Sequence, residues 1–278
     1  MRCHFVTDLH GRPDRYAKLF EAVGTERPGA VFLGGDLLPH ASGGDAFVHA
    51  VLGPGFRNLR SLLGEAYPRV FLILGNDDGR MPEEALLRED ADGLWHYAHG
   101  RSFPLGAFTV HGYCFVPPTP FRLKDWEKYD VSAYVPPGCV SPEEGVRSLP
   151  VPENLVRHGT IRDDLEALLG NADLKDAVIL FHTPPCDTAL DRAALDGKAI
   201  DHVPLDLHVG SVAVRRFIEK KQPLVTLHGH VHESARLTGS WRERLGRTWM
   251  LGGAHDGPEL ALVRFDPGDP GGATRELL

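Results

Sequence analysis

The sequence predicts an α/β fold built on buried strands that are largely parallel. Short apolar runs recur at residues 3–6, 30–33, 70–74, 177–181 and 224–227, and helical patterns lie between several of them. The runs are continuous rather than alternating, which is typical of strands buried on both faces. Strands that alternate with helices favour a parallel sheet with right-handed crossovers.

Three helices are expected between these strands. Pro13 suits the first turn of a helix, where its missing N–H costs nothing. Thr160 and Ser211 are expected to be the N-caps of two later helices. Apolar residues on the first helix recur at i, i+3, i+4 and i+7, which places them on one stripe. This stripe consists of Tyr16, Leu19, Phe20 and Val23.

The 278 residues are expected to form one domain with a proline-rich insertion at about 113–157. Eight prolines between 117 and 152 break any regular period, so this stretch is either a functional lid or a wrapped surface segment. Two later runs, one ending at Leu251 and one at 260–265, are predicted to be closing strands of a second sheet. The Gly- and Pro-rich stretch after Asp266 is predicted to be a frayed tail.

The composition excludes several classes of function. No apolar run approaches the roughly 18 residues of a membrane helix, and the first run reaches Asp8 too soon for a cleaved signal sequence, so a cytoplasmic location is expected. Four scattered cysteines predict neither a zinc knuckle nor a disulfide framework. The net charge of -8 argues against binding to duplex nucleic acid. A small anionic substrate stays compatible if metal ions concentrate positive charge locally.

Each of the five buried runs ends at residues of metal-binding types. The carboxyl ends of parallel strands line one crevice, so these side chains are expected to converge there. Residues two apart in an extended chain point the same way, which favours paired ligands. Singly, each residue has an ordinary structural explanation as a turn residue or a buried histidine, but five coincidences favour a site. The residues are Asp8, His10, Asp36, Asn76, Asp77, His182, His228 and His230.

The blocks DLH, GGD, GNDD, FHTPP and GHVH occur in this order between Asp8 and His232. Together they resemble the calcineurin-like metallophosphoesterase superfamily, whose pattern is D-x-H, GD, GN(H) with D or E, H, and GHxH, and in particular its small prokaryotic members. The resemblance implies a four-layer αββα sandwich of two mixed β-sheets. It also implies hydrolysis of a phosphate ester by a hydroxide shared between two divalent metal ions.

Carried over to this sequence, the resemblance assigns two ligand sets that share Asp36. The first set is Asp8, His10, Asp36 and His230, and the second is Asp36, Asn76, His182 and His228. Imidazole and carboxylate ligands favour manganese, iron or zinc over calcium or magnesium. Asp77, Asn76 and His228 are the residues predicted to be catalytic, and Arg12, His232, His202 and His255 are predicted substrate contacts.

One departure from the family pattern bears on the substrate. The family usually has a histidine after the asparagine of its third block, where it contacts the phosphate and helps to protonate the leaving oxygen, whereas this chain has Asp77. A carboxylate is a poorer acid near pH 7. We therefore expect a small activated or cyclic phosphodiester, with nucleotides among the candidates.

Three other functions stay open from the sequence. The first is a phosphomonoesterase of the same fold. The second is a non-catalytic scaffold, like the retromer subunit of the superfamily, which an intact ligand set disfavours. The third is a nuclease similar to the DNA-repair members, which the acidic charge disfavours.

Overall fold

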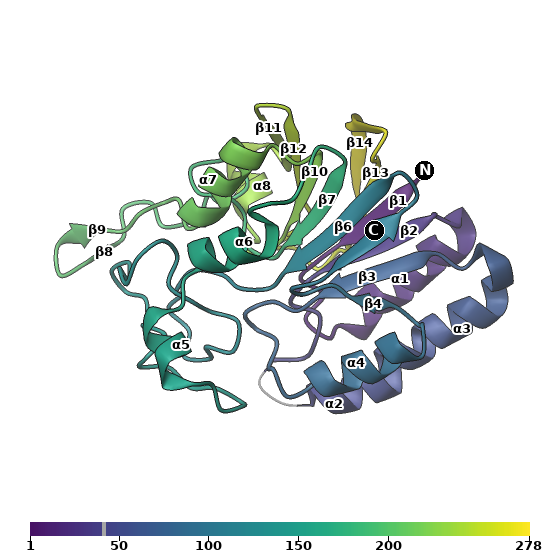
Figure 1. The fold of residues 1–278 in the computed structure, drawn as a ribbon, viewed down its shortest axis with the longest axis horizontal. Coiled ribbons are helices and arrows are strands. Elements are labelled where there is room, and N and C mark those ends of the chain that lie inside the picture. Colours follow the sequence, from purple (N-terminus) through teal and green to yellow (C-terminus); the bar gives the residue numbers. More distant parts are fainter. Residues whose placement is uncertain (41–42) are drawn as a thin grey trace.

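Two six-stranded sheets form the centre of the protein in the computed structural model, which describes residues 1–40 and 43–278 (Figure 1). The first sheet has the order β14-β13-β1-β2-β3-β4. Strands β1 to β4 are parallel, whereas β13 and β14 are antiparallel to their neighbours. The strands are β1 (Cys3–Val6), β2 (Ala30–Gly34), β3 (Arg69–Ile73), β4 (His96–Tyr97), β13 (Ala261–Asp266) and β14 (Asp269–Leu277).

The second sheet has the order β11-β12-β10-β7-β6-β5. Its four central strands are parallel, and an antiparallel strand closes each edge. The strands are β5 (Ser102–Leu105), β6 (Phe108–Tyr113), β7 (Ala177–Phe181), β10 (Val225–His228), β11 (Arg242–Leu245) and β12 (Thr248–Gly252). A separate hairpin, β8 (Ala199–Ile200) with β9 (Val203–Pro204), projects from the body of the molecule (Figure 1).

Helices cover the outer face of each sheet. On the first sheet lie α1 (Pro13–Glu26), α2 (Gly44–Phe47), the π-helix η1 (Val48–Leu52), α3 (Gly53–Leu63), the 3-10 turn η2 (Gly64–Ala66) and α4 (Glu83–Ala91). On the second lie α6 (Ile161–Leu169), α7 (Val212–Lys221) and α8 (Ser234–Thr238), with α5 (Glu153–His158) farther out. Strand β2 packs on β7 and β3 on β6, so the inner faces of the sheets meet. The predicted αββα sandwich of two mixed sheets is confirmed.

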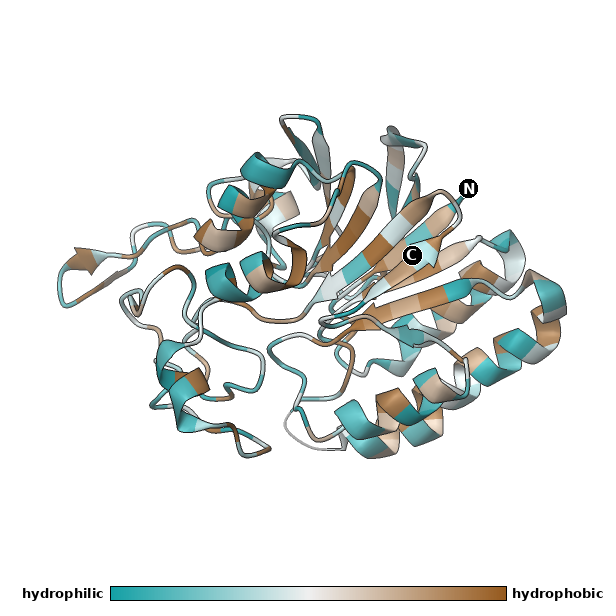
Figure 2. Cartoon of the chain, viewed as in Figure 1, coloured by the Kyte–Doolittle hydropathy of each residue, from teal (hydrophilic) through white to brown (hydrophobic). Residues whose placement is uncertain are grey.

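Local sequence signals placed the helix starts correctly. Helix α1 begins at Pro13. The Thr160 hydroxyl accepts a hydrogen bond from the N–H of Asp163, and the Ser211 hydroxyl accepts one from Val214. Figure 2 shows why the strands are continuous apolar runs: hydrophobic residues concentrate on the strands between the helical layers. No helix in the described part of the chain is long and apolar enough to span a bilayer.

Two expectations about the C-terminal region were wrong. Strand β12 joins the second sheet, but β13 returns to the first sheet and pairs with β1. The predicted frayed tail is strand β14, which pairs antiparallel with β13. Strand β14 lies at the edge of its sheet, so one of its sides does not hydrogen-bond to another strand. Pro270, which lacks a backbone N–H, is therefore tolerated in it.

The proline-rich segment after β6 is anchored to the rest of the fold. The Asp125 carboxylate accepts hydrogen bonds from the N–H groups of Arg80 and Ser148, at 2.8 and 2.9 Å. Trp126 is fully buried. The Asp130 carboxylate accepts hydrogen bonds from the first N–H groups of α7, beginning with Val212 at 2.7 Å. The segment therefore forms a fixed wall beside the loop that follows β3.

Candidate metal centre

Two buried aspartates lie at the carboxyl ends of β1 and β2. The residues Asp8 and Asp36 are 1% and 2% exposed. Both have a positive φ, 55° and 52°, in the left-handed region that residues other than glycine rarely adopt. The loops are held together by backbone hydrogen bonds from Asp8 N–H to Gly35 O and from His10 N–H to Asp36 O. Such strain persists where surrounding contacts impose it, and it often marks functional sites.

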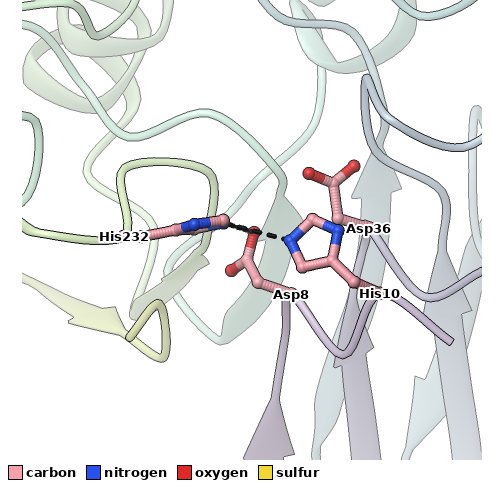
Figure 3. Close-up of side chains that lie close together, drawn as sticks. All are labelled: Asp8, His10, Asp36 and His232. Carbon is pink, nitrogen blue, oxygen red and sulfur yellow. Dashed lines mark hydrogen bonds and ion pairs between the residues drawn. The ribbon is translucent and has the colours of Figure 1, made fainter. Parts of the chain in front are cut away.

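A first group of potential ligands consists of Asp8, His10, Asp36 and His232. One donor atom from each lies within 4.8 Å of the others. Figure 3 shows His232 reaching from the loop after β10 towards Asp8 and His10. Its Nε2 is 3.3 Å from Asp8 Oδ1 and 3.2 Å from His10 Nε2.

A second group joins Asp36 to His182 and His230, again within 4.8 Å. His182 Nδ1 donates to the carbonyl oxygen of Gly34 at 2.8 Å, which directs Nε2 towards the group. This Nε2 lies 3.2 Å from both Asp36 Oδ2 and Asn76 Oδ1. Asp36 therefore belongs to both groups, as the predicted ligand sets require.

The structure brings His230 and His232 to the two groups, whereas the sequence predicted His228 and His230. His228 lies on β10 and is buried away from both groups: Nδ1 donates to Thr183 O at 2.9 Å, and Nε2 lies 2.7 Å from Thr226 Oγ1. His230 falls in the second group rather than the first, and His232 takes its place. Strand β10 ends at His228, so the chain is no longer extended and residues two apart need not point the same way. The histidines of the GHVH block are His230 and His232, the two that fall in these groups.

Glycines let the ligand loops approach one another. A Cβ atom at Gly229 would lie 2.2 Å from Thr7 Oγ1 and 2.7 Å from Asp8 Oδ2. One at Gly75 would lie 2.3 Å from Asp36 Oδ1. A side chain at either position would clash with these atoms, so the loops could not approach one another this closely.

The charges of this region fit bound cations. Among the described residues, neither Asp8 nor Asp36 forms an ion pair with a lysine or arginine side chain; their charged partners are histidines. Although burial opposes protonation of His232, its hydrogen bond to Asp8 raises its pKa to about 9. Burial lowers the pKa of His230 to about 3. Buried carboxylates whose charged partners are histidines rather than lysine or arginine suit metal ions, and the imidazole and carboxylate donors suit transition metals.

Two residues that the sequence did not single out support the ligand loops. The Asp78 carboxylate accepts hydrogen bonds from the N–H groups of Leu37 and Leu38, and also from Gly75, so it ties the loop after β2 to the loop after β3. The Arg15 guanidinium, on α1, donates to the carbonyl oxygen of Asp8. Both contacts are to backbone atoms; Asp78 is the last residue of the GNDD block, whereas no motif marks Arg15.

Most of the predicted substrate contacts border one cavity of about 260 Å³ beside the first group. It is lined by His10, Arg12, Arg15, His40, His232, His255, Asp256 and Gly257. His202 is different: it lies in the exposed turn of the β8–β9 hairpin, outside this cavity (Figure 1). The expected contact between His202 and the substrate is therefore not supported.

Asp77 and His40 stand next to each other at this cavity. The Asp77 N–H donates to Asp36 Oδ1 at 2.9 Å, and the Asp77 carboxylate lies 3.4 Å from His40 Nδ1. Burial, with a further contribution from Asp36, raises the pKa of Asp77 to about 6. His40 was missed by the sequence reasoning; its one signal is its position four residues after Asp36, in the same loop.

Comparisons with known proteins show the family and the fold of the chain. Residues 1–234 match the family model described as calcineurin-like phosphoesterase. A crystal structure of TT1561 from Thermus thermophilus is 18% identical with a TM-score of 0.56, covering 99% of this chain and 98% of that one. A dimetal phosphatase from Danio rerio is 15% identical with a TM-score of 0.48, covering 95% and 91%. The comparison with curated proteins gives no match. At such identities the likeness to TT1561 shows a shared fold.

Proposed function

Because the chain belongs to the calcineurin-like phosphoesterase family, we propose that it is a metal-dependent hydrolase that cleaves a small, activated or cyclic phosphodiester. The observation that carries this proposal is the position of Asp36 in both groups of potential ligands. A carboxylate shared in this way suits a pair of ions a few ångströms apart.

The proposed ligand sets follow the geometry rather than the original assignment. Asp8, His10, Asp36 and His232 would hold one ion, and Asp36, Asn76, His182 and His230 the other. When bound, two divalent ions, with manganese, iron and zinc as candidates, would activate a water at neutral pH and offset the charge of the phosphate.

The chain prepares this site before any ligand binds. The hydrogen bond from His182 Nδ1 to Gly34 O fixes the tautomer of the imidazole and leaves Nε2 as the donor to an ion. Asp78 fixes the spacing of the loops that carry Asp36 and Asn76. The ligands therefore need little reorganisation, which favours tight binding and catalysis.

Charge balance favours a diester over a monoester. Two divalent ions less the carboxylates of Asp8 and Asp36 would leave about +2, and loss of a proton from the activated water would lower this to about +1. A monoanionic diester matches that charge. A dianionic monoester would leave excess negative charge, and its repulsion by Asp77 is worth about 1 kcal/mol at partly screened distances.

We expect kcat/KM of the manganese-loaded protein to be higher for bis-p-nitrophenyl phosphate than for p-nitrophenyl phosphate. The variant Asp77→His should shift the ratio towards the monoester by about fivefold or more, which corresponds to the 1 kcal/mol above. Asp173→Asn, at an exposed loop position, is the matched control. A preference of the parent protein for the monoester would contradict the diester assignment and favour a phosphomonoesterase of the same fold.

Metal binding itself is expected to stabilise the fold. An ion that binds only the native state at 100 times its dissociation constant adds about 2.7 kcal/mol, which at this chain length raises Tm by roughly 5–10 °C. Differential scanning fluorimetry of chelator-treated protein, with and without manganese, measures this shift. A protein that shows neither a shift nor turnover would instead be a scaffold.

A further inference from the structure

Asp77 lies between the two proposed ligand sets and contacts a member of each. The Asn76 amide nitrogen Nδ2 donates to Asp77 Oδ1 at 3.2 Å, and Asn76 belongs to the second set. Asp77 Oδ2 lies 3.7 Å from Nδ1 of His10, which belongs to the first set. The backbone N–H of Asp77 donates to Oδ1 of Asp36, which the sets share, at 2.9 Å. One residue therefore contacts ligands of both sets.

The contact with Asn76 decides which end of its amide faces the site. An amide has one acceptor oxygen and a donor NH2 group, and only the oxygen can bind a cation. The NH2 group donates to Asp77, which leaves Oδ1 to face the second group, 3.2 Å from His182 Nε2. The Asp77 carboxylate thus fixes the amide in the orientation that a metal ligand needs.

His10 needs a similar partner. Its Nε2 faces His232, 3.2 Å away (Figure 3), so this nitrogen is placed to bind an ion. The single proton of a neutral imidazole is then on Nδ1, which is buried and has no hydrogen-bond partner in the described part of the chain. Histidines that bind metal ions almost always donate this second N–H to a carboxylate, a carbonyl or water. A shift of about half an ångström would bring Asp77 Oδ2 within hydrogen-bond distance.

We propose that Asp77 is a positioning residue, whose carboxylate orients Asn76 and His10 so that each presents its metal-binding atom to a different ion. This inference rests on the proposed function. Contacts that orient a ligand in this way typically contribute about 10–100-fold to metal affinity. Asp77 therefore acts on the site through its ligands and does not touch the reacting atoms.

The test titrates manganese into the chelator-treated full chain and follows binding by isothermal titration calorimetry. Asp77→Asn keeps the shape of the side chain and the backbone N–H that contacts Asp36. Its amide has one acceptor oxygen, so its NH2 group must face one of the two donors, Asn76 or His10. We expect manganese affinity to fall by about 10–100-fold. The Tm of the chelated protein should change by less than about 4 °C, because the fold around the side chain is kept.

Asp256→Asn is the control for the loss of charge alone. Asp256 lines the same cavity, but its carboxylate accepts a hydrogen bond from Arg236 at 2.7 Å and contacts neither ligand set among the described residues. A nearby charge that is partly exposed to water is screened. We therefore expect this variant to lower manganese affinity by less than about fivefold, or about 1 kcal/mol.

A second measurement separates orientation of the ligands from donation of a proton to the departing oxygen. It compares kcat for methyl phenyl phosphate and methyl p-nitrophenyl phosphate at saturating manganese. Phenol needs such a proton more than p-nitrophenol, whose nitro group delocalises the developing charge. If Asp77 orients ligands, Asp77→Asn should change kcat for the two esters by the same factor.

Three results would contradict parts of this account. Unchanged manganese affinity in Asp77→Asn, or a fall no larger than that in Asp256→Asn, would overturn the positioning role and leave the proposed hydrolysis intact. A much larger loss of kcat on the phenyl ester would also overturn it, because Asp77 would then act on the departing oxygen. Absence of turnover by a parent protein that binds manganese more tightly than Asp77→Asn would remove the proposed hydrolysis but support the orientation of the ligands.

Discussion

Replacing Asp36 by asparagine is expected to lower kcat/KM for a phosphodiester by more than about 1000-fold, or about 4 kcal/mol of transition-state stabilisation. Asp36 belongs to both of the proposed ligand sets, so its change weakens both proposed ion positions at once. Asparagine keeps the shape of the side chain but lacks the charge and the second anionic oxygen that a shared ligand needs.

The result is measured with bis-p-nitrophenyl phosphate, together with metal content by elemental analysis. Metal content should fall below that of the parent, while circular dichroism should remain the same, because the side chain changes by one atom. The control is again Asp173→Asn, which alters an exposed carboxylate far along the chain. If Asp36→Asn kept two ions and most of its activity, the shared-ligand arrangement would be wrong.

Changing His232 and His228 separately is expected to give opposite outcomes. His232→Ala removes a side chain that lies 3.3 Å from Asp8 and is about one-third exposed, so we expect a loss of activity above 100-fold with little change in stability. His228→Asn changes a buried residue whose side chain contacts Thr183 and Thr226. Asparagine keeps a donor towards Thr183 O but loses the second contact, which costs about 1–2 kcal/mol.

Thermal denaturation and specific activity of the folded fraction separate these outcomes. For His228→Asn, Tm should fall by roughly 2–8 °C while specific activity and metal content stay close to those of the parent. For His232→Ala, Tm of the chelated protein should be unchanged. A loss of metal from His228→Asn with retention in His232→Ala would restore the original assignment of the histidines.

Much of the architecture was encoded locally in the sequence. The continuous apolar runs predicted the five strands to within about a residue, because burial on both faces leaves no polar alternation. The caps Thr160 and Ser211 were predictable because each supplies an acceptor for the first unpaired N–H groups of a helix. The ends of the strands also marked where the potential ligands gather, since parallel strands deliver their carboxyl ends to one edge.

The C-terminal strands could not be assigned to a sheet in this way. The run in β13 is apolar in the same manner as that in β12, yet β13 pairs with β1 across the molecule. A strand's own residues specify its burial but not its partner, which depends on the positions of all the others. Strand β13 in turn pairs with β14. The glycines and the proline of β14 do not predict a strand by themselves, so its conformation depends on this partner.

The sequence by itself determined the kind of fold, the family and the loops that carry the potential ligands, because hydrophobic periodicity and short motifs express them directly. Only the tertiary structure decided which histidines face the centre and that His40 lies against Asp77. The physical reason is that the period of two holds only while the chain is extended. Once the chain turns at Gly229, the direction of each side chain is set by packing between the two sheets.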